Sequence, residues 1–468
     1  MAEMFSSNVI SQVVREVLQN INIEDSNKYL SNGFGIFNTI EEAVEAAYKA
    51  QQEFLKRSLN DREKVIDCIR TVLRPLVKEM AERTVKETNR GRIDHKINKN
   101  LASINKTSGV EDLKSSALTG DYGLTLLEYA PFGVIGAITP VTNPTETIIS
   151  NTISMTAAGN AVVFCCHPNA VNTSIWLVEK INEAIIQAVN IPNLITMTAR
   201  SSMEDVDYVM NSEKINLLSI TGGPFIVNKA LSSGKVTIGA SAGNPPVIVD
   251  ETADIEQAAK DIVLGASLDN NMPCIAEKEV IVVDSVADYL IYNMEKNNAL
   301  LIKDKNDIEA IKRTILKDDN KINTEFVGKS PKYIMEKAGF SCSHNPDLLI
   351  METDASHPFA VEELMMPVLP VIRVKDFNTA LDYAVKLERG FCHTAVMHSK
   401  HVDRLSLAPR TLRTTIFVKN APSYAGIGIG GEGMTSFTIA SATGHGITSP
   451  RSFSRQRRCV LHGSFSIK

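Results

Sequence analysis

Two successive stretches of the chain alternate short apolar runs with segments of helical pattern, and this alternation restricts the fold more than any other feature. From about residue 123 to 250 the apolar runs are Ala161-Val162-Val163-Phe164, Leu194-Ile195-Thr196-Met197 and Leu217-Leu218-Ser219-Ile220-Thr221. From about 247 to 420 they are 279–283, 368–374 and 415–418. Such runs, separated by helices, are typical of parallel sheets covered by helices on both faces. The sequence therefore predicts an α/β protein, and 468 residues are too many for one core.

Composition narrows the class of protein. A net charge of -5 provides no basic field for nucleic acid, and no run of about 18 apolar residues is present to span a membrane. The seven cysteines are scattered and none has the Cys-x-x-Cys spacing of a metal site. The first residues lack the basic segment followed by an apolar segment that is typical of a secretory signal peptide. We therefore expect a cytoplasmic protein with no metal, no membrane contact and no nucleic-acid partner.

The first 20 residues differ in pattern from the rest of the chain. Apolar side chains recur there at steps of three and four, as on one face of a helix, from Phe5 to Ile21. A polar, glycine-containing linker occupies 21–35. The pattern predicts either a tethered amphipathic helix that docks on a partner or an ordinary first helix packed on its own domain.

Both ends of the remaining chain also give local signals. Residues 39 to 115 have helical periodicity, and Thr39 with Glu42 forms the pattern of a capping box. The last segment, 426–468, is rich in glycine, serine and threonine and ends in an alternating strand from Arg455 to Leu461.

Three turns carry the residues with chemical potential. Cys274 comes after Asn270-Asn271-Met272-Pro273 and precedes a strand. Upstream, 239–246 is a glycine- and proline-containing turn, and 129–136 is an apolar strand that runs into Thr139-Pro140-Val141-Thr142-Asn143-Pro144. Turns at the ends of buried strands can present backbone N–H groups and small side chains to a ligand.

In this order the three turns resemble the aldehyde dehydrogenase superfamily, and more narrowly its coenzyme A-acylating branch. The resemblance covers about residues 35 to 468. It implies two Rossmann-type domains with parallel sheets, a dinucleotide- and CoA-binding domain over 36–240 and a catalytic domain over 241–425. It also implies a β oligomerisation arm, made from a hairpin at about 120–130 and the strand in 426–468.

The resemblance identifies Cys274 as the nucleophile, and a thiolate suits both attack on an aldehyde and later departure from a thioester. It identifies Asn143 as an amide donor that, with the backbone N–H of Cys274, stabilises the developing alkoxide. The alternatives are a buried structural thiol at Cys274 and a turn asparagine before Pro144.

Ala240 departs from the hydrolytic members of this family, which have a glutamate there as the general base for water. Without that carboxylate, the thioacyl enzyme can wait for the thiol of coenzyme A. The sequence Asn244-Pro245-Pro246 is similar to the acylating members.

The resemblance also implies residues that bind the dinucleotide. Thr221-Gly222-Gly223 closes a strand and opens a helix at about Phe225, where glycines let the backbone approach a pyrophosphate. Glu363 corresponds to the glutamate that holds the nicotinamide ribose, with a solvated loop charge as the alternative. The remaining expected contacts are Thr139, Pro140, His167 and Pro168, the last two on a site shared by NAD and CoA.

Other positions stay open. Many relatives have a lysine near Cys165, and its absence leaves NADP as an alternative to NAD. We expect His393 to be a packed structural histidine. The arginines near the C-terminus can meet phosphates or lie on an exposed oligomer strand, and we favour the second reading: Arg455, Arg457 and Arg458.

The resemblance implies an enzyme that converts a short-chain aldehyde, propionaldehyde in preference, with NAD and CoA into acyl-CoA and NADH. In the acylating enzymes of bacterial microcompartments a tethered N-terminal helix is an encapsulation peptide. We therefore expect a shell protein as partner, a location inside a microcompartment, and a homodimer or homotetramer. The alternatives are an acetaldehyde-specific enzyme, a hydrolytic dehydrogenase and a non-enzymatic scaffold.

Overall fold

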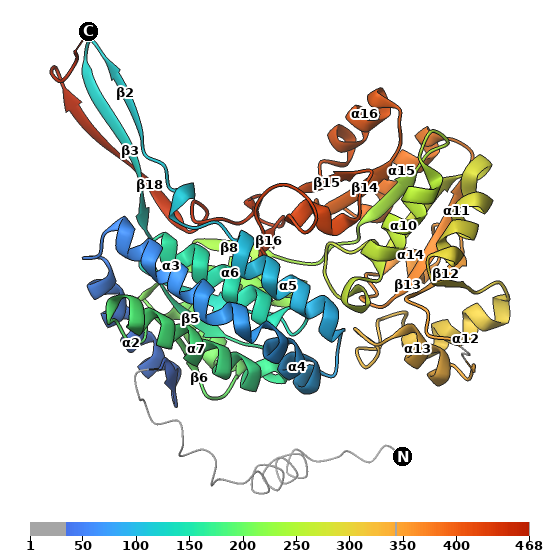
Figure 1. Cartoon of the computed structure of the whole chain (residues 1–468), viewed down its shortest axis with the longest axis horizontal. Helices are drawn as coiled ribbons and strands as arrows, with labels where there is room; N and C mark the ends of the chain where they lie inside the picture. Colours follow the sequence, from blue (N-terminus) through green and yellow to red (C-terminus); the bar gives the residue numbers. More distant parts are fainter. Residues whose placement is uncertain (1–33, 342–343, 468) are drawn as a thin grey trace, which may run out of the picture.

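The computed structural model describes residues 34–341 and 344–467. Figure 1 shows two lobes, each built on a sheet, and a long antiparallel ribbon that projects from the first lobe. The predicted docking helix at 1–20 and nearly all of the linker at 21–35 lie outside the described residues.

The first lobe begins with a layer of helices, as the periodicity of residues 39 to 115 predicts. They are α2 (Ile40–Phe54), α3 (Leu59–Leu73), α4 (Val77–Thr88) and α5 (Ile93–Lys106). Thr39 and Glu42 form the capping box at the start of α2, so this prediction is confirmed.

Six parallel strands form the sheet of the first lobe, in the spatial order β1-β6-β5-β4-β7-β8. They are β1 (Ile36–Phe37), β4 (Val134–Ile138), β5 (Ala161–Cys165), β6 (Ile195–Thr198), β7 (Ile215–Thr221) and β8 (Thr237–Ala240). From β4 the chain winds outward through β5 and β6, then returns to the other side of β4 with β7 and β8. The order therefore reverses between β4 and β7, and in doubly wound sheets ligands bind beyond the carboxyl ends of the strands at such a point.

Four further helices belong to this lobe: α6 (Pro144–Ala157), α7 (Val171–Val189), α8 (Met203–Asn211) and α9 (Pro224–Leu231). Every residue of α6 is buried, because this helix contacts β5 on one side and α3, α5 and α7 on others. The helix that comes after β4 is thus fixed in the centre of the lobe.

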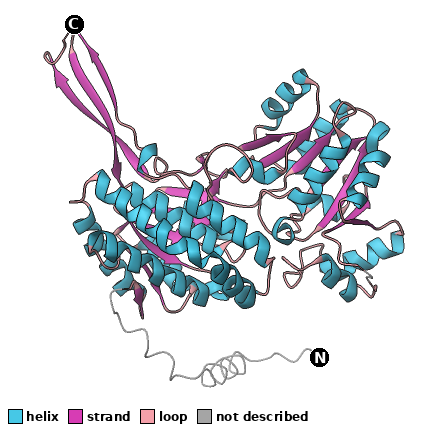
Figure 2. Ribbon diagram, viewed as in Figure 1, coloured by secondary structure: helices cyan, strands magenta, loops and turns pink. Residues whose placement is uncertain are grey.

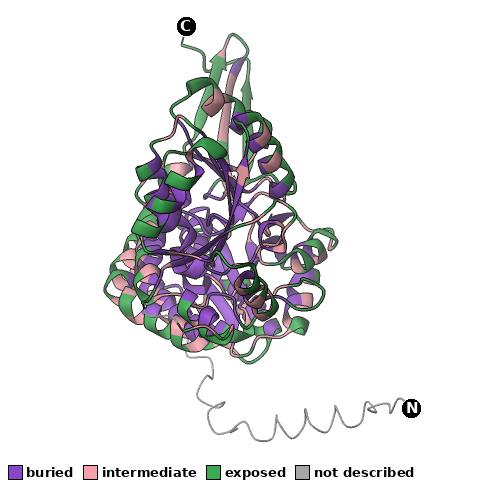
Figure 3. Ribbon diagram, turned by 90° about the vertical axis from the view of Figure 1, so that its right-hand side faces the viewer, coloured by how far each residue is buried: buried purple, intermediate pink, exposed green. Residues whose placement is uncertain are grey.

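Seven parallel strands form the sheet of the second lobe, in the order β11-β12-β13-β10-β9-β14-β15. They are β9 (Pro246–Val249), β10 (Glu279–Val283), β11 (Ala299–Leu301), β12 (Leu348–Glu352), β13 (Val368–Val374), β14 (Thr394–His398) and β15 (Ile416–Lys419). Its helices are α10 (Ile255–Ala266), α11 (Asp284–Lys296), α12 (Lys305–Ile315), α13 (Pro331–Lys337), α14 (Pro358–Val361), α15 (Phe377–Glu388) and α16 (Val402–Leu412). Figures 2 and 3 show both sheets as buried strands wrapped by helices, so the predicted α/β class is confirmed.

A short connection joins the two sheets. Strand β8 ends at Ala240 and β9 begins at Pro246, so only five residues join the carboxyl edge of the first sheet to the amino edge of the second. Loops from these two opposed edges therefore share one region of the molecule.

The projecting ribbon consists of β2 (Ser116–Gly120), β3 (Gly123–Pro131) and β18 (Ser454–His462), paired antiparallel in the order β18-β3-β2. The expected hairpin near 120–130 and the expected C-terminal strand are both present in it. One expectation is wrong: residues 129–136 are not a single strand. Gly133, with φ of 126°, separates β3 of the ribbon from β4 of the first sheet.

A small antiparallel pair, β16 (Ile439–Ala440) and β17 (Gly446–Ile447), precedes β18 and lies near the junction of the lobes in Figure 1. Among the described residues, no helix is both long and apolar enough to cross a membrane.

Candidate active site

Three consecutive left-handed residues shape the loop that leads to Cys274. Asp269, Asn270 and Asn271 have φ of 50°, 56° and 62°. Asp and Asn tolerate this conformation better than other non-glycine residues. The Asn270 amide donates to the carbonyl of Gly328 at 2.8 Å, and that of Asn271 to Ala266 and Glu277 at 2.7 and 2.9 Å. The side chains of the polar run therefore hold residues 268–278, the Cys274 loop, in one conformation.

Cys274 is partly exposed, whereas its neighbours in the loop are buried. Burial raises its pKa to about 12, and the negative charge of Glu363 adds to the rise while Lys278 opposes it. The resting side chain is therefore a neutral thiol, and the attacking thiolate forms only when its proton is removed.

Asn143 stands between β4 and α6, immediately before Pro144. Its side chain makes no capping bond to α6. Instead the side-chain oxygen accepts a 2.6 Å hydrogen bond from Lys99 Nζ, and the amide nitrogen is 3.3 Å from Thr142 Oγ1. The structure thus leaves an amide N–H of Asn143 available for a ligand.

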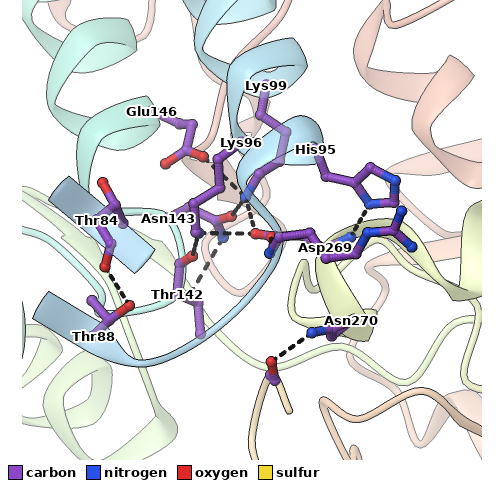
Figure 4. Close-up of polar contacts among 12 residues, drawn as sticks. Thr84, Thr88, His95, Lys96, Lys99, Thr142, Asn143, Glu146, Asp269 and Asn270 are labelled. Carbon is purple, nitrogen blue, oxygen red and sulfur yellow. Dashed lines mark hydrogen bonds and ion pairs between the residues drawn. The ribbon is translucent and has the colours of Figure 1, made fainter. Parts of the chain in front are cut away.

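A buried ion cluster joins Asn143 to the Cys274 loop (Figure 4). It consists of Lys96, Lys99, Glu146 and Asp269, none of whose side chains is exposed. Asp269 Oδ2 accepts from Lys96 at 2.9 Å and from Lys99 at 2.6 Å, and Lys99 lies 3.0 Å from Glu146. Burial alone would raise the pKa of Asp269, but the two ammonium groups lower it to about 2. The cluster bridges the lobes, because Asp269 comes after α10 and the other three residues lie on α5 and α6.

The residues expected to bind a dinucleotide lie just beyond the carboxyl ends of adjacent strands. Thr139 and Pro140 come after β4, while Thr221, Gly222 and Gly223 end β7 and begin α9. These are the two strands between which the sheet order reverses. His167 and Pro168 come after the neighbouring β5, with His167 Nδ1 accepting from the backbone N–H of Asn169 at 3.2 Å.

Three features of this edge fit a dinucleotide. Thr139 Oγ1 is buried and has no hydrogen-bond partner among the described residues. The N-terminus of α9 has no side-chain cap, and a Cβ at Gly223 would meet no described atom within 4 Å. Free backbone donors at an open helix N-terminus suit a pyrophosphate. The residues present therefore fit NAD or NADP.

The second lobe contributes residues that lie just before the amino ends of its strands. Glu363 precedes β13, and burial raises its pKa to about 7 although Lys278 opposes the rise. His393 precedes β14 and is fully buried, with Nδ1 2.8 Å from Thr394 Oγ1. Burial, and secondarily Lys278, lower its pKa to about 4, so His393 is neutral as a packed histidine is expected to be.

The turn that joins the sheets passes directly behind Cys274. A Cβ built at Gly243 would lie 3.0 Å from the carbonyl oxygen of Cys274 and 2.8 Å from His393 Cγ, so only glycine fits without a shift. Asn244 is buried and donates to the carbonyls of Ala360 and Leu387, which makes its role structural. Ala240, buried at the end of β8, supplies no base to this turn.

A comparison with protein families matches residues 35–447 to the aldehyde dehydrogenase family. The chain belongs to this family. Among characterised relatives, this aldehyde dehydrogenase is 49% identical to the CoA-propanoylating propanal dehydrogenase of Salmonella typhimurium, over 93% of this chain and 94% of the relative. It is 43% identical to the acetylating acetaldehyde dehydrogenase EutE of the same organism, over 98% of this chain and 99% of that relative.

Solved structures agree in fold. The propionaldehyde dehydrogenase of Rhodopseudomonas palustris with bound CoA and an acylated cysteine has a TM-score of 0.92 and 47% identity, covering 94% of this chain and 100% of that one. A propionaldehyde dehydrogenase from the fucose utilisation microcompartment of Clostridium phytofermentans has a TM-score of 0.91 and 45% identity, covering 93% and 100%. The aldehyde dehydrogenase fold expected from the sequence is confirmed.

Sequence reasoning missed four charged residues of this aldehyde dehydrogenase's site: Lys96, Lys99, Asp269 and Lys278. A sequence signal existed for Asp269 alone, since Asp269-Asn270-Asn271 combines residue types that favour left-handed backbone. The described residues contain no group of three or more His, Cys, Asp or Glu side chains suited to a metal ion. Arg455, Arg457 and Arg458 lie on β18 of the projecting ribbon, away from these loops.

Proposed function

We propose that this aldehyde dehydrogenase oxidises a short-chain aldehyde, propionaldehyde in preference, and transfers the acyl group to coenzyme A with NAD as the oxidant. One observation carries the proposal: Cys274 and Asn143 are linked through the buried ion cluster, while Ala240 gives water no base. A nucleophile and an alkoxide donor without a hydrolytic base are what a thioester enzyme needs.

In the first step the Cys274 thiol loses its proton to solvent, its sulfur bonds to the aldehyde carbon, and the carbonyl π electrons move to oxygen. Asn143 and the backbone N–H of Cys274 donate to that alkoxide, an interaction that can lower the barrier by about 3 kcal/mol. Bound NAD supplies the hydride acceptor. When hydride leaves the carbon, the C=O bond re-forms and Cys274 carries a thioester.

In the second step the thiol of coenzyme A loses its proton to solvent, its sulfur attacks the thioester carbon, and the Cys274 thiolate departs. The acyl-CoA forms, and the Cys274 thiolate takes up a proton from solvent, so that one proton is released in the whole reaction. The relatives support this order, since one is named for CoA-propanoylating activity and another was solved with CoA and an acylated cysteine. We propose that the dinucleotide and CoA are held by the residues at the strand ends described above, namely Glu363, Thr139, Pro140, His167, Pro168, Thr221, Gly222 and Gly223.

Acetaldehyde is the second candidate substrate. It is favoured by the similarity to EutE, which extends over 98% of this chain. The higher identity to the propanal enzyme, 49% against 43%, ranks propionaldehyde first. Hydrolytic oxidation ranks below both because of Ala240.

Steady-state kinetics with aldehydes of two to four carbons, with and without CoA, test the proposal. We expect acyl-CoA and NADH in equal amounts, the highest kcat/KM for propionaldehyde, and no sustained turnover without CoA. Free acid formed at the same rate without CoA would contradict the acylating function. A preference for acetaldehyde would leave the chemistry intact and overturn only the substrate ranking.

We also propose that residues 1–20 dock this enzyme to a microcompartment shell. Support comes from their apolar helical stripe and from the microcompartment origin of a structural relative. A fluorescent protein fused to residues 1–20 should become punctate when shell proteins are co-expressed. A fusion whose apolar stripe residues Val13 and Val17 are replaced by Glu is the matched control, and diffuse fluorescence from the unaltered fusion would contradict docking.

The projecting ribbon is the proposed oligomerisation arm. It exposes apolar side chains such as Leu118, Tyr122 and Val460, which a second subunit would cover. Light scattering should give a dimer or tetramer, and Leu118→Glu with Val460→Glu should shift it toward monomer. A monomeric parent enzyme would contradict this assignment.

A further inference from the structure

Lys99 contacts the candidate alkoxide donor and the Cys274 loop at the same time. Its Nζ lies 2.6 Å from Asn143 Oδ1, 2.6 Å from Asp269 Oδ2 and 3.0 Å from Glu146 Oε1. Two of these contacts are hydrogen bonds, to Asn143 and Asp269, and the contact with Glu146 is an ion pair. Figure 4 shows the lysine reaching from α5 to the point where the two lobes meet.

An ammonium can donate and cannot accept, so Lys99 selects one of the two orientations of the Asn143 amide. Oxygen must face Nζ, and the NH₂ group must face the other way. The charge also polarises the amide, which makes its N–H a stronger donor in this dry environment.

Asp269 extends the same control to the nucleophile. It is the first of the three left-handed residues of the Cys274 loop, and its Oδ1 accepts from the backbone N–H of Arg92 at 2.7 Å. Lys96 adds a bond to Asp269 and one to the carbonyl of Thr142 at 3.2 Å, next to Asn143. The loops that carry Cys274 and Asn143 come from different lobes, yet both are bonded to the same pair of lysines.

We propose that Lys99 is a positioning residue for acylation, which orients the Asn143 amide toward the alkoxide and fixes its distance from Cys274 through Asp269. This proposal rests on the proposed acylating function. Burial alone would lower the pKa of Lys99, but Asp269 and Glu146 raise it above its ordinary value, so the lysine stays charged.

The test is a double-mutant cycle read on the hydride-transfer step. Enzyme, NAD and propionaldehyde are mixed without CoA, and the first turnover of NADH is followed in the parent, Lys99→Met, Asn143→Ala and the double variant. We expect Lys99→Met to slow this turnover about 10- to 100-fold, less than the full loss of a donor, with little change in KM. In the Asn143→Ala background the same change should cost less than about threefold, because the residue it orients is gone.

Lys96→Met is the matched control, since it removes an equally buried ammonium that contacts Asp269 but not Asn143. Its effect should multiply with that of Asn143→Ala. If Lys99→Met fails to fold, Lys99→Met with Glu146→Gln keeps the cluster neutral and enters the same cycle.

The proposal would be overturned if the effects of Lys99→Met and Asn143→Ala on the first-turnover rate multiplied. It would also be overturned if Lys99→Met changed only KM or only the thermal stability of the enzyme. A parent enzyme without a first turnover of NADH would instead refute the proposed function, so the two failures are distinguishable.

Discussion

Lys278 Nζ donates to both the side-chain oxygen and the backbone carbonyl of Asn271, at 2.6 and 2.9 Å, three residues before Cys274. The lysine is itself buried, immediately before β10. It therefore fixes the C-terminal part of the Cys274 loop while Asp269 is bonded near its start, and the nucleophile lies between two charged contacts.

Replacing Lys278 by Met should destabilise the enzyme by roughly 3 kcal/mol, because it leaves buried acceptors without their charged donor. Acylation of Cys274 should slow as well, since the loop loses one of its two fixed points. Urea unfolding and the first-turnover rate measure the two effects. Lys260→Met, at an exposed position on α10, is the control, and a Lys278 variant no less stable than this control would contradict the role of Lys278 in holding the loop.

The charge of Glu363 raises the pKa of Cys274 beyond the effect of burial, so Glu363→Gln should increase thiol reactivity. Below a pKa of about 12 the thiolate fraction rises about tenfold per pH unit, and alkylation by iodoacetamide should rise with pH accordingly. At any pH between about 7 and 9 the variant should react faster than the parent. Glu362→Gln removes a neighbouring half-exposed charge paired with Arg389 and should change little. Slower alkylation of the Glu363 variant would show that this carboxylate acts as a base.

Asn143→Ala should lower kcat by about 10²–10³, the effect of losing one alkoxide donor. Binding of NAD should stay near that of the parent, because the side chain is engaged with Lys99 and Thr142. Stopped-flow and equilibrium titration separate the two quantities. A change in KM alone would assign Asn143 to substrate positioning.

Ala240→Glu should permit oxidation of the aldehyde to free acid without CoA, because a carboxylate there can activate water. The residue is buried, so Ala240→Gln is needed as a control of equal size without a base. Free acid is measured directly in reactions lacking CoA. Equal acid production by the Glu and Gln variants would refute this explanation of Ala240.

The sheet strands were predictable because their patterns are local. The runs at 279–283 and 368–374 are the strands β10 and β13, and Thr39 with Glu42 caps α2 as expected. Buried apolar strands and capping boxes depend on residues close in sequence, so they can be read without knowledge of the packing.

The buried ion cluster was not predictable in the same way. Lys99 and Asp269 are 170 residues apart, and lysines on an amphipathic helix are ordinarily expected on the solvated side. The break at Gly133 between two strands of different sheets was missed for a related reason, since one apolar stretch serves two partners. Both the ion cluster and the break at Gly133 depend on contacts between residues far apart in the sequence.

The thioester on Cys274 is the central claim, and peptide mass spectrometry tests it most directly. Enzyme is incubated with propionaldehyde and NAD in the absence of CoA, digested at low pH and mapped. We predict a mass increase of one propionyl group on the peptide containing Cys274, absent in Cys274→Ala, and its loss on addition of CoA as propionyl-CoA appears. An unmodified Cys274 peptide from enzyme that has formed NADH, or the propionyl group on another residue, would contradict the thioester mechanism.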